Sequence, residues 1–179
     1  MPIGPEDIER LLDPTYVEGL PTRSMEEIRA ARIELQEAET AVSFQRRLVQ
    51  GRLDLIHSER HRRQEGGDRD MRSLVEELPS ILAEHSRTPG PGRLPRYVDP
   101  GEDASVLTDE VDAVADPRAM ADLSVLSDED LTALTEALSQ LERVVSDRRH
   151  NLHLSLDAVH EEIVRRYQSG EASVDTLLK

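Results

Sequence analysis

The sequence predicts an all-α protein in which two long helices form an antiparallel coiled-coil hairpin, accompanied by short accessory helices and a flexible linker. Apolar residues in two stretches recur at alternating steps of three and four, the heptad pattern of a helix that packs along a seam. Only 2% of the residues are aromatic and 33% are charged, which favours long solvated helices over a broad globular core. A hairpin is the simpler topology for two helices that follow one another in sequence.

The chain begins with an N-terminal segment, residues 1–23, and continues with a long helix, residues 24–67. The N-terminal segment contains a short helix from Glu6 to Leu12, which is either a frayed end or a partner-binding segment. Ser24 and Glu27 form a capping box that starts the long helix. The residues of its seam are Ile28, Ala31, Leu35, Ala38, Val42, Gln45, Val49, Arg52 and Ile56.

Residues 68–126 combine a short helix at 71–85 with a Pro/Gly-rich stretch and an acidic linker. We expect the acidic part, from Asp99 to Asp122, to be ordered in part at most. Ser127 and Asp130 cap a second long helix, residues 127–169, and a tail follows at 170–179. The seam of this helix contains Leu131, Leu134, Leu138, Leu141, Val145, Arg148, Leu152, Ser155 and Val159.

The second long helix repeats the first at an offset of 103 residues, which indicates an internal duplication. Each copy carries the pattern E-x3-S-x2-R-x3-Q-x3-D, whose spacing keeps five polar side chains on one stripe of a helix. A solvated face is the alternative interpretation of a single copy, but the duplication and the polar seam residues near the motifs favour a ligand site. The two copies are Glu39, Ser43, Arg46, Gln50 and Asp54, and Glu142, Ser146, Arg149, His153 and Asp157, with His153 in place of glutamine.

The doubled motif on two long helices resembles the RsiG family of actinobacterial anti-sigma factors. The resemblance implies that the ten motif residues bind cyclic di-GMP, as a dimer of the ligand. It also implies that the loaded protein sequesters a WhiG-like sigma factor and so blocks transcription in sporulation. With two motifs in one chain, a monomer suffices for the site, and no enzymatic activity is expected.

The motif residues suit a guanine nucleotide. Arg46 and Arg149 offer planar, charged groups for guanine or phosphate. The carboxylates of Asp54 and Asp157 can accept hydrogen bonds from the adjacent N–H groups of a guanine, which selects guanine over adenine. The other expected roles are phosphate donors for Ser43 and Ser146, base or ribose contacts for Gln50 and His153, and either arginine orientation or guanine binding for Glu39 and Glu142.

Composition limits the other functions. The net charge of −15 argues against nucleic-acid binding and favours a basic protein partner. The chain has no cysteine, and His57 and His61 lack a third ligand, so we expect no metal site. No apolar run approaches the ~20 residues of a membrane span, and the first residues lack signal-peptide features. We therefore expect a cytoplasmic protein without a membrane contact.

Phe44, Leu48 and Leu55 form a second apolar stripe, opposite the seam of the first long helix. This stripe is either a sigma-factor contact or the face that the short helix at 71–85 covers. Two alternatives to the anti-sigma interpretation stay open. One is a structural coiled coil or homodimer without a ligand. The other is an enzyme that acts on a nucleotide, although the sequence has no nucleophile elbow or phosphate loop.

Overall fold

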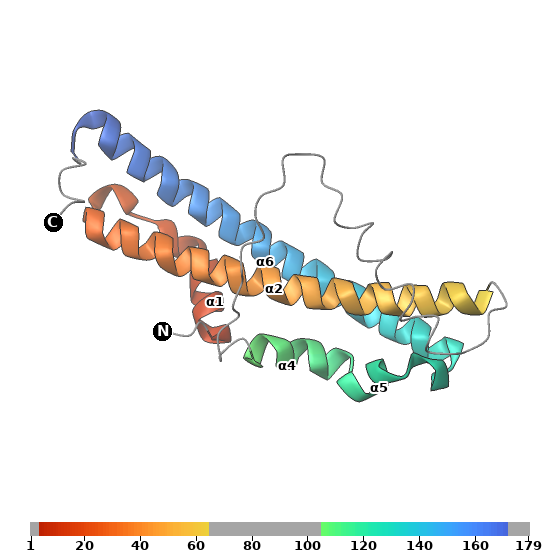
Figure 1. The fold of residues 1–179 in the computed structure, drawn as a ribbon. Helices are drawn as coiled ribbons and strands as arrows, with labels where there is room; N and C mark the ends of the chain where they lie inside the picture. Colours follow the sequence, from red (N-terminus) through yellow and green to blue (C-terminus); the bar gives the residue numbers. More distant parts are fainter. Residues whose placement is uncertain (1–3, 65–104, 172–179) are drawn as a thin grey trace. The chain divides into compact units, whose positions relative to one another are not determined.

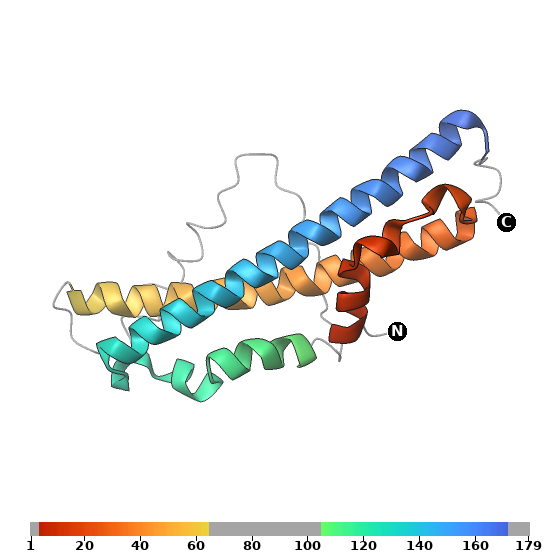
Figure 2. The same cartoon turned by 180° about the vertical axis from the view of Figure 1, so that it is seen from behind.

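The computed structural model of the chain describes residues 4–64 and 105–171 (Figures 1 and 2). Within these ranges every regular element is helical, which confirms the predicted all-α class. The short helix predicted at 71–85, the Pro/Gly-rich stretch and most of the predicted tail lie outside the described residues. None of the described helices is both long and apolar enough to cross a membrane.

Two long helices, α2 (Met25–Gln64) and α6 (Asp128–Ser169), account for most of the described residues. Each contributes one half to each of two compact units. The second half of α6 belongs with the first half of α2, and the first half of α6 belongs with the second half of α2. The first unit contains Met1–Phe44, Pro100–Leu107 and Val145–Lys179, and the second unit contains Gln45–Asp99 and Thr108–Val144.

The two helix halves run antiparallel in each unit. In the first unit, Arg29 near the start of α2 donates a hydrogen bond to the hydroxyl of Tyr167 near the end of α6, at 2.9 Å. In the second unit, Arg63 near the end of α2 forms an ion pair with Asp128, the first residue of α6. The antiparallel pairing predicted from the sequence is therefore confirmed within each unit.

The predicted seams form the cores of both units. Of the nine seam positions predicted on α2, eight are at most 5% exposed, and only Arg52 is half-buried. Burying a leucine or valine side chain contributes roughly 1.5–3 kcal/mol, so these contacts hold the helices together. The seam residues of α6 that are fully buried are Leu131, Leu138, Val145, Leu152 and Val159.

Both long helices begin at the predicted caps. The backbone N–H of Glu27 donates to Ser24 Oγ at 3.2 Å, and the backbone N–H of Ser24 donates to the Glu27 carboxylate at 2.6 Å. Ser127 and Asp130 make the same reciprocal pair at 3.2 and 3.1 Å. α6 ends before Gly170, whose left-handed backbone (φ 76°) suits a residue without a Cβ atom.

The N-terminal segment folds against α2 in the first unit. The short helix predicted from Glu6 to Leu12 is not a frayed end, because Ile8 and Leu11 are 3% and 0% exposed. Arg10 and the hydroxyl of Tyr16 both donate to the carboxylate of Glu34 on α2, at 3.0 and 3.1 Å. The elements of this segment are α1 (Pro5–Leu12) and the 3₁₀ turns η1 (Pro14–Val17) and η2 (Leu20–Thr22).

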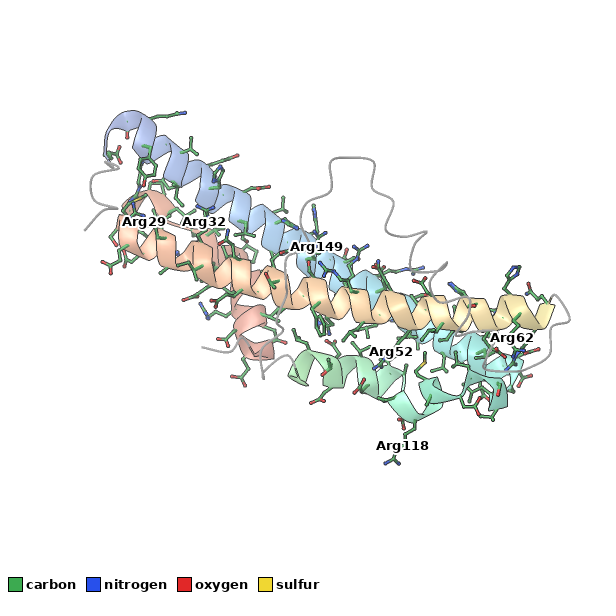
Figure 3. The ribbon with its side chains drawn as sticks, in the orientation of Figure 1. Arg29, Arg32, Arg52, Arg62, Arg118 and Arg149 are labelled. Carbon is green, nitrogen blue, oxygen red and sulfur yellow. The ribbon has the colours of Figure 1, made fainter. Side chains whose placement is uncertain are left out.

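From residue 105 onward the acidic stretch before α6 is helical and begins with α4 (Ser105–Val114), whereas residues 99–104 of the predicted stretch lie outside the described residues. Val111 and Ala115, four residues apart, are fully buried and make an apolar face. Arg52 lies between α2 and α4 (Figure 3), and it donates to the carbonyls of Val111 and Ala115 at 2.9 and 2.7 Å. It also pairs with Asp112. These donors satisfy carbonyls at a helix C-terminus. The elements are α4 (Ser105–Val114), α5 (Pro117–Ala121) and the turn η4 (Leu123–Val125).

The internal duplication extends upstream of the long helices. Asp13-Pro14 and Asp116-Pro117 stand at the same offset of 103 residues. Each aspartate accepts a hydrogen bond from the backbone N–H two residues later, at 2.8 Å in both copies. Leu20 and Leu123, at the same offset, are both buried at the start of a 3₁₀ turn. Both copies therefore keep the turn that leads into the long helix.

Candidate functional site

The structure divides the motif residues into two half-sites, and each half-site combines residues of both helices within one unit. The first half-site contains Glu39 and Ser43 of α2 with Arg149 and His153 of α6, and Asp157 follows His153 by one helical turn in the same unit. The second half-site contains Arg46, Gln50 and Asp54 of α2 with Glu142 of α6, all in the second unit. Ser146, the tenth motif residue, is half-buried on α6 and belongs to the first unit.

Glu39 is the common partner of the polar groups in the first half-site. Arg149 (labelled in Figure 3) donates through Nε to Glu39 Oε1 at 3.1 Å and to Ser43 Oγ at 2.9 Å. The hydroxyl of Ser43 donates to the same Glu39 oxygen at 2.7 Å. His153 Nε2 lies 3.4 Å from that oxygen. One carboxylate therefore positions the serine of its own helix and the arginine of the opposite helix.

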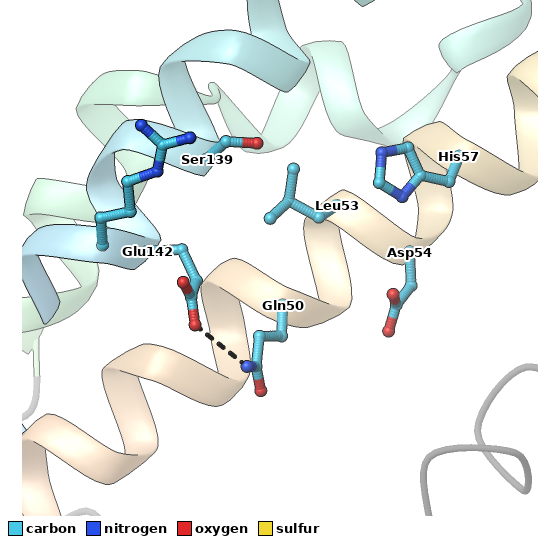
Figure 4. Close-up of a pocket in the computed structure, with 7 residues that line it drawn as sticks. Gln50, Leu53, Asp54, His57, Ser139 and Glu142 are labelled. Carbon is cyan, nitrogen blue, oxygen red and sulfur yellow. Dashed lines mark hydrogen bonds between the residues drawn. The ribbon is translucent and has the colours of Figure 1, made fainter. Parts of the chain in front are cut away.

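Glu142 has the same function in the second half-site. Arg46 donates through Nε to Glu142 Oε1 at 3.0 Å, and the side-chain amide of Gln50 donates to the same oxygen at 3.2 Å. Figure 4 shows Gln50 and Glu142 pointing toward each other from α2 and α6. In both half-sites the glutamate of one motif binds the arginine of the other motif, and His153 stands where Gln50 stands in the second half-site.

The two ion pairs are alike in exposure as well as in geometry. The side chains of Arg46 and Arg149 are 36% and 38% exposed, and those of Glu142 and Glu39 are 23% and 21% exposed. Arg149 uses only Nε for these contacts, and its terminal nitrogens make no hydrogen bond within residues 4–64 and 105–171. Its guanidinium group is thus oriented by Glu39 and still offers N–H groups to an anion or a base.

The aspartates of the motif differ between the half-sites. Asp54 is half-buried, whereas Asp157 is exposed. Both keep the acceptor-only chemistry that a guanine edge requires. Asp54 is thus the more enclosed of the two aspartates, and it lines a cavity.

This cavity has a volume of about 390 Å³ and lies in the second unit. Its size is within the ~300–1,000 Å³ typical of small-molecule sites. The motif contributes Gln50, Asp54 and Glu142 to its wall (Figure 4). Four further lining residues were not predicted from the sequence, because they lie outside the repeated motif: Leu53, His57, Ser139 and Arg143.

Among the residues that the structure describes, no group of three or more histidine, aspartate or glutamate side chains is arranged to hold a metal ion. Phe44, Leu48 and Leu55, the predicted sigma-factor contact, are half-buried. The segment predicted to cover them, 71–85, lies outside the described residues.

Comparison with known proteins identifies one family. A family model described as RsiG-like matches residues 14–82 and 117–179. The two matched ranges include all ten motif positions and both long helices. No curated protein sequence matches the chain.

Proposed function

The chain belongs to the RsiG-like family, and from this premise we propose that it is an anti-sigma factor controlled by cyclic di-GMP. Family membership supports the coarser part of this proposal, a non-enzymatic regulator whose partner is a sigma factor. The finer part is that the two motifs bind cyclic di-GMP and that the loaded protein sequesters a WhiG-like sigma factor.

The observation that carries the ligand proposal is the repeated pairing of glutamate with arginine across the two helices. Glu39 with Arg149 and Glu142 with Arg46 form the same contact at 3.1 and 3.0 Å. A solvated face does not require that polar residues of two helices meet in the same way at two places. One nucleotide bound in each half-site does make use of it, since each nucleotide needs an equally oriented arginine.

Each half-site carries the groups that a guanine nucleotide needs. The arginine fork can bind the O6 and N7 atoms of guanine or a phosphate oxygen. The aspartate can accept from the N–H groups of the guanine edge, and Gln50 or His153 can bond the base or the ribose. We expect about two ligands per chain, with both half-sites in one polypeptide, so a monomer suffices.

Ligand binding and partner binding are coupled through the glutamate–arginine pairs. A phosphate or a base that binds the guanidinium group of Arg46 or Arg149 adds a contact to an arginine that already joins the two helices through its glutamate. The sigma factor then recognises the loaded form, because the ligand strengthens the contacts that join the two helices. The charge of −15 favours a partner with a basic surface, and the stripe of Phe44, Leu48 and Leu55 supplies an apolar contact.

Calorimetric titration of the full chain with cyclic di-GMP tests this proposal, with cyclic di-AMP as the matched control for the carboxylate contact to guanine. We expect guanine-selective binding and, in a pull-down, retention of the sigma factor only with ligand present. Absence of cyclic di-GMP binding both alone and with the sigma factor present contradicts the proposal and favours a structural coiled coil. Chromatography of the incubated mixture distinguishes an enzyme, which converts the nucleotide over time.

A further inference from the structure

The cavity of the second half-site contains a positive charge that the motif does not supply. Arg143 lines this cavity together with His57, Asp54 and Glu142. It is exposed, and within the described residues it makes no hydrogen bond and no ion pair. Arg46, by contrast, is paired with Glu142 at 3.0 Å. A ligand that enters the cavity therefore meets the guanidinium group of Arg143, which no ion pair within the described residues occupies.

The first half-site lacks an equivalent arginine. At the offset of 103 residues that relates the two repeats, Arg143 corresponds to Thr40. The hydroxyl of Thr40 donates to the backbone carbonyl of Gln36 on its own helix, at 2.8 Å. A threonine bound to its own backbone offers no charge to a ligand. The motif residues make the half-sites similar, whereas this position makes them different.

The other three lining residues outside the motif have the same charge in both repeats. Leu53 and His57 correspond to Leu156 and His160, so both repeats have the same residues there. Ser139 corresponds to Gln36 and is uncharged in both cases. Four lining residues lie outside the motif. With histidine counted as neutral, Arg143 is the one among these four at which the two repeats differ in charge.

We propose that Arg143 binds a phosphate of the nucleotide ligand and makes the second half-site the tighter of the two. The inference rests on the proposed function and adds a specificity-determining residue outside the motif. The ligand class is an anionic nucleotide phosphodiester, which the guanidinium fork binds through parallel N–H groups. His57, on the wall of the same cavity, adds a second donor beside the phosphate.

The expected effect is moderate, because Arg143 is exposed. A hydrogen bond to a charged group contributes more than a neutral one, but solvent weakens an exposed ion pair. We expect Arg143→Thr, which installs the residue of the other repeat, to lower the affinity of the tighter binding step about five- to tenfold. The reciprocal change Thr40→Arg should strengthen the weaker step by a similar factor. Folding should be little affected by Arg143→Thr, since the side chain is exposed and makes no hydrogen bond or ion pair to any residue that the structure describes.

The experiment is calorimetric titration of the full chain with cyclic di-GMP, in the wild type, in Arg143→Thr and in Arg47→Thr. Arg47 is an exposed arginine of α2 that does not line the cavity, so its substitution removes the same charge at another place. We expect two binding steps of unequal affinity in the wild type. Arg143→Thr should lower the affinity of the tighter step, and Arg47→Thr should leave both affinities unchanged. Higher salt should narrow the difference between the wild type and Arg143→Thr.

The outcomes separate this inference from the function on which it rests. If the wild type binds cyclic di-GMP and Arg143→Thr binds it equally well, the role of Arg143 is overturned and the proposed function stands. If Arg47→Thr weakens binding as much as Arg143→Thr, general electrostatic attraction replaces a cavity contact, and the inference is again overturned. If the wild type does not bind, with or without the sigma factor, both proposals fail together.

Discussion

Arg166 donates a hydrogen bond to the backbone carbonyl of Leu20 at 2.9 Å, although 146 positions separate the two residues in the chain. The same guanidinium group donates to the carbonyl of Pro21 at 3.2 Å and, through Nε, to Glu162 at 2.6 Å. These hydrogen bonds join the end of α6 to the turn that precedes α2. This contact closes the end of the first unit at which α2 begins and α6 ends.

Arg63, the counterpart of Arg166 in the other repeat, fastens the second unit in the same manner. It donates to the carbonyls of Leu123 and Leu126, both at 2.9 Å, and through Nε to Glu59 at 2.6 Å. Glu59 is 2% exposed. In each unit a buried glutamate holds an arginine that caps the turn before the opposite helix.

Replacing Arg63 or Arg166 by methionine should destabilise the fold. Methionine preserves the length of the side chain, but it leaves backbone carbonyls without donors, each at a cost of about 1–3 kcal/mol. Urea unfolding followed by circular dichroism measures the change. Arg118→Met is the control, because Arg118 is exposed and points away from the ribbon in Figure 3, and surface substitutions usually change stability by within about 0.5 kcal/mol. Equal stability of all three variants would contradict a stabilising role for the hydrogen bonds from Arg63 and Arg166 to the backbone carbonyls.

The hydrogen bonds that Glu162 accepts from Arg165 and Arg166 make the stability of the fold depend on pH. Hydrogen bonds from Arg165 and Arg166 lower the pKa of Glu162 from its ordinary value of 4.5 to about 2. A carboxyl group whose pKa is lowered by folding stabilises the fold fully above its unfolded pKa. That stabilisation is therefore lost as the pH falls from about 4.5 to about 2.

Glu162→Gln should remove this contribution, since an amide does not titrate in that range. Thermal unfolding at pH 5.5 and at pH 2.5 compares the two proteins. We expect the wild type to lose more of its thermal stability between these conditions than the variant does. An identical loss in both proteins would assign the acid sensitivity to other carboxylates.

The helix seams and caps could be predicted because each depends on spacing along a single helix. Leu35 and Leu138 are fully buried where the heptad pattern places them. Ser24 and Ser127 begin the long helices because a serine and an acidic residue three positions later satisfy each other's backbone N–H groups. No information on the partner helix is needed for these predictions.

The pairing of Glu39 with Arg149 could not be predicted, because it depends on the register between two helices. Along one helix Glu39 and Arg46 are roughly 10 Å apart at 1.5 Å per residue, so the sequence leaves open whether the glutamate orients an arginine or binds guanine, and which arginine it meets. The seam residues Gln45 and Arg52 were interpreted as support for a ligand site. In the structure, Gln45 donates to Glu110 at 2.7 Å and Arg52 pairs with Asp112. Both partners lie on α4, a helix that was not predicted because the stretch is acidic.

Substitution of a motif arginine or aspartate by alanine should lower the affinity for cyclic di-GMP at least about tenfold, which corresponds to about 1.4 kcal/mol. Arg46 and Arg149 are oriented by glutamates across the helix pair, so their removal takes away a positioned charge. Calorimetric titration of the four single variants, at Arg46, Arg149, Asp54 and Asp157, gives the measurement. Unchanged affinity in all four variants would show that the motifs do not bind this ligand.

Phe44→Glu should abolish sigma-factor binding and spare ligand binding. Phe44 is half-buried on the predicted partner stripe, and a charge there opposes burial against an apolar partner surface. A pull-down with cyclic di-GMP measures partner binding, and calorimetry of the same variant measures ligand binding. Thermal unfolding accompanies both, so that a folding defect is recognised. Retention of the sigma factor by a folded variant would place the partner contact elsewhere.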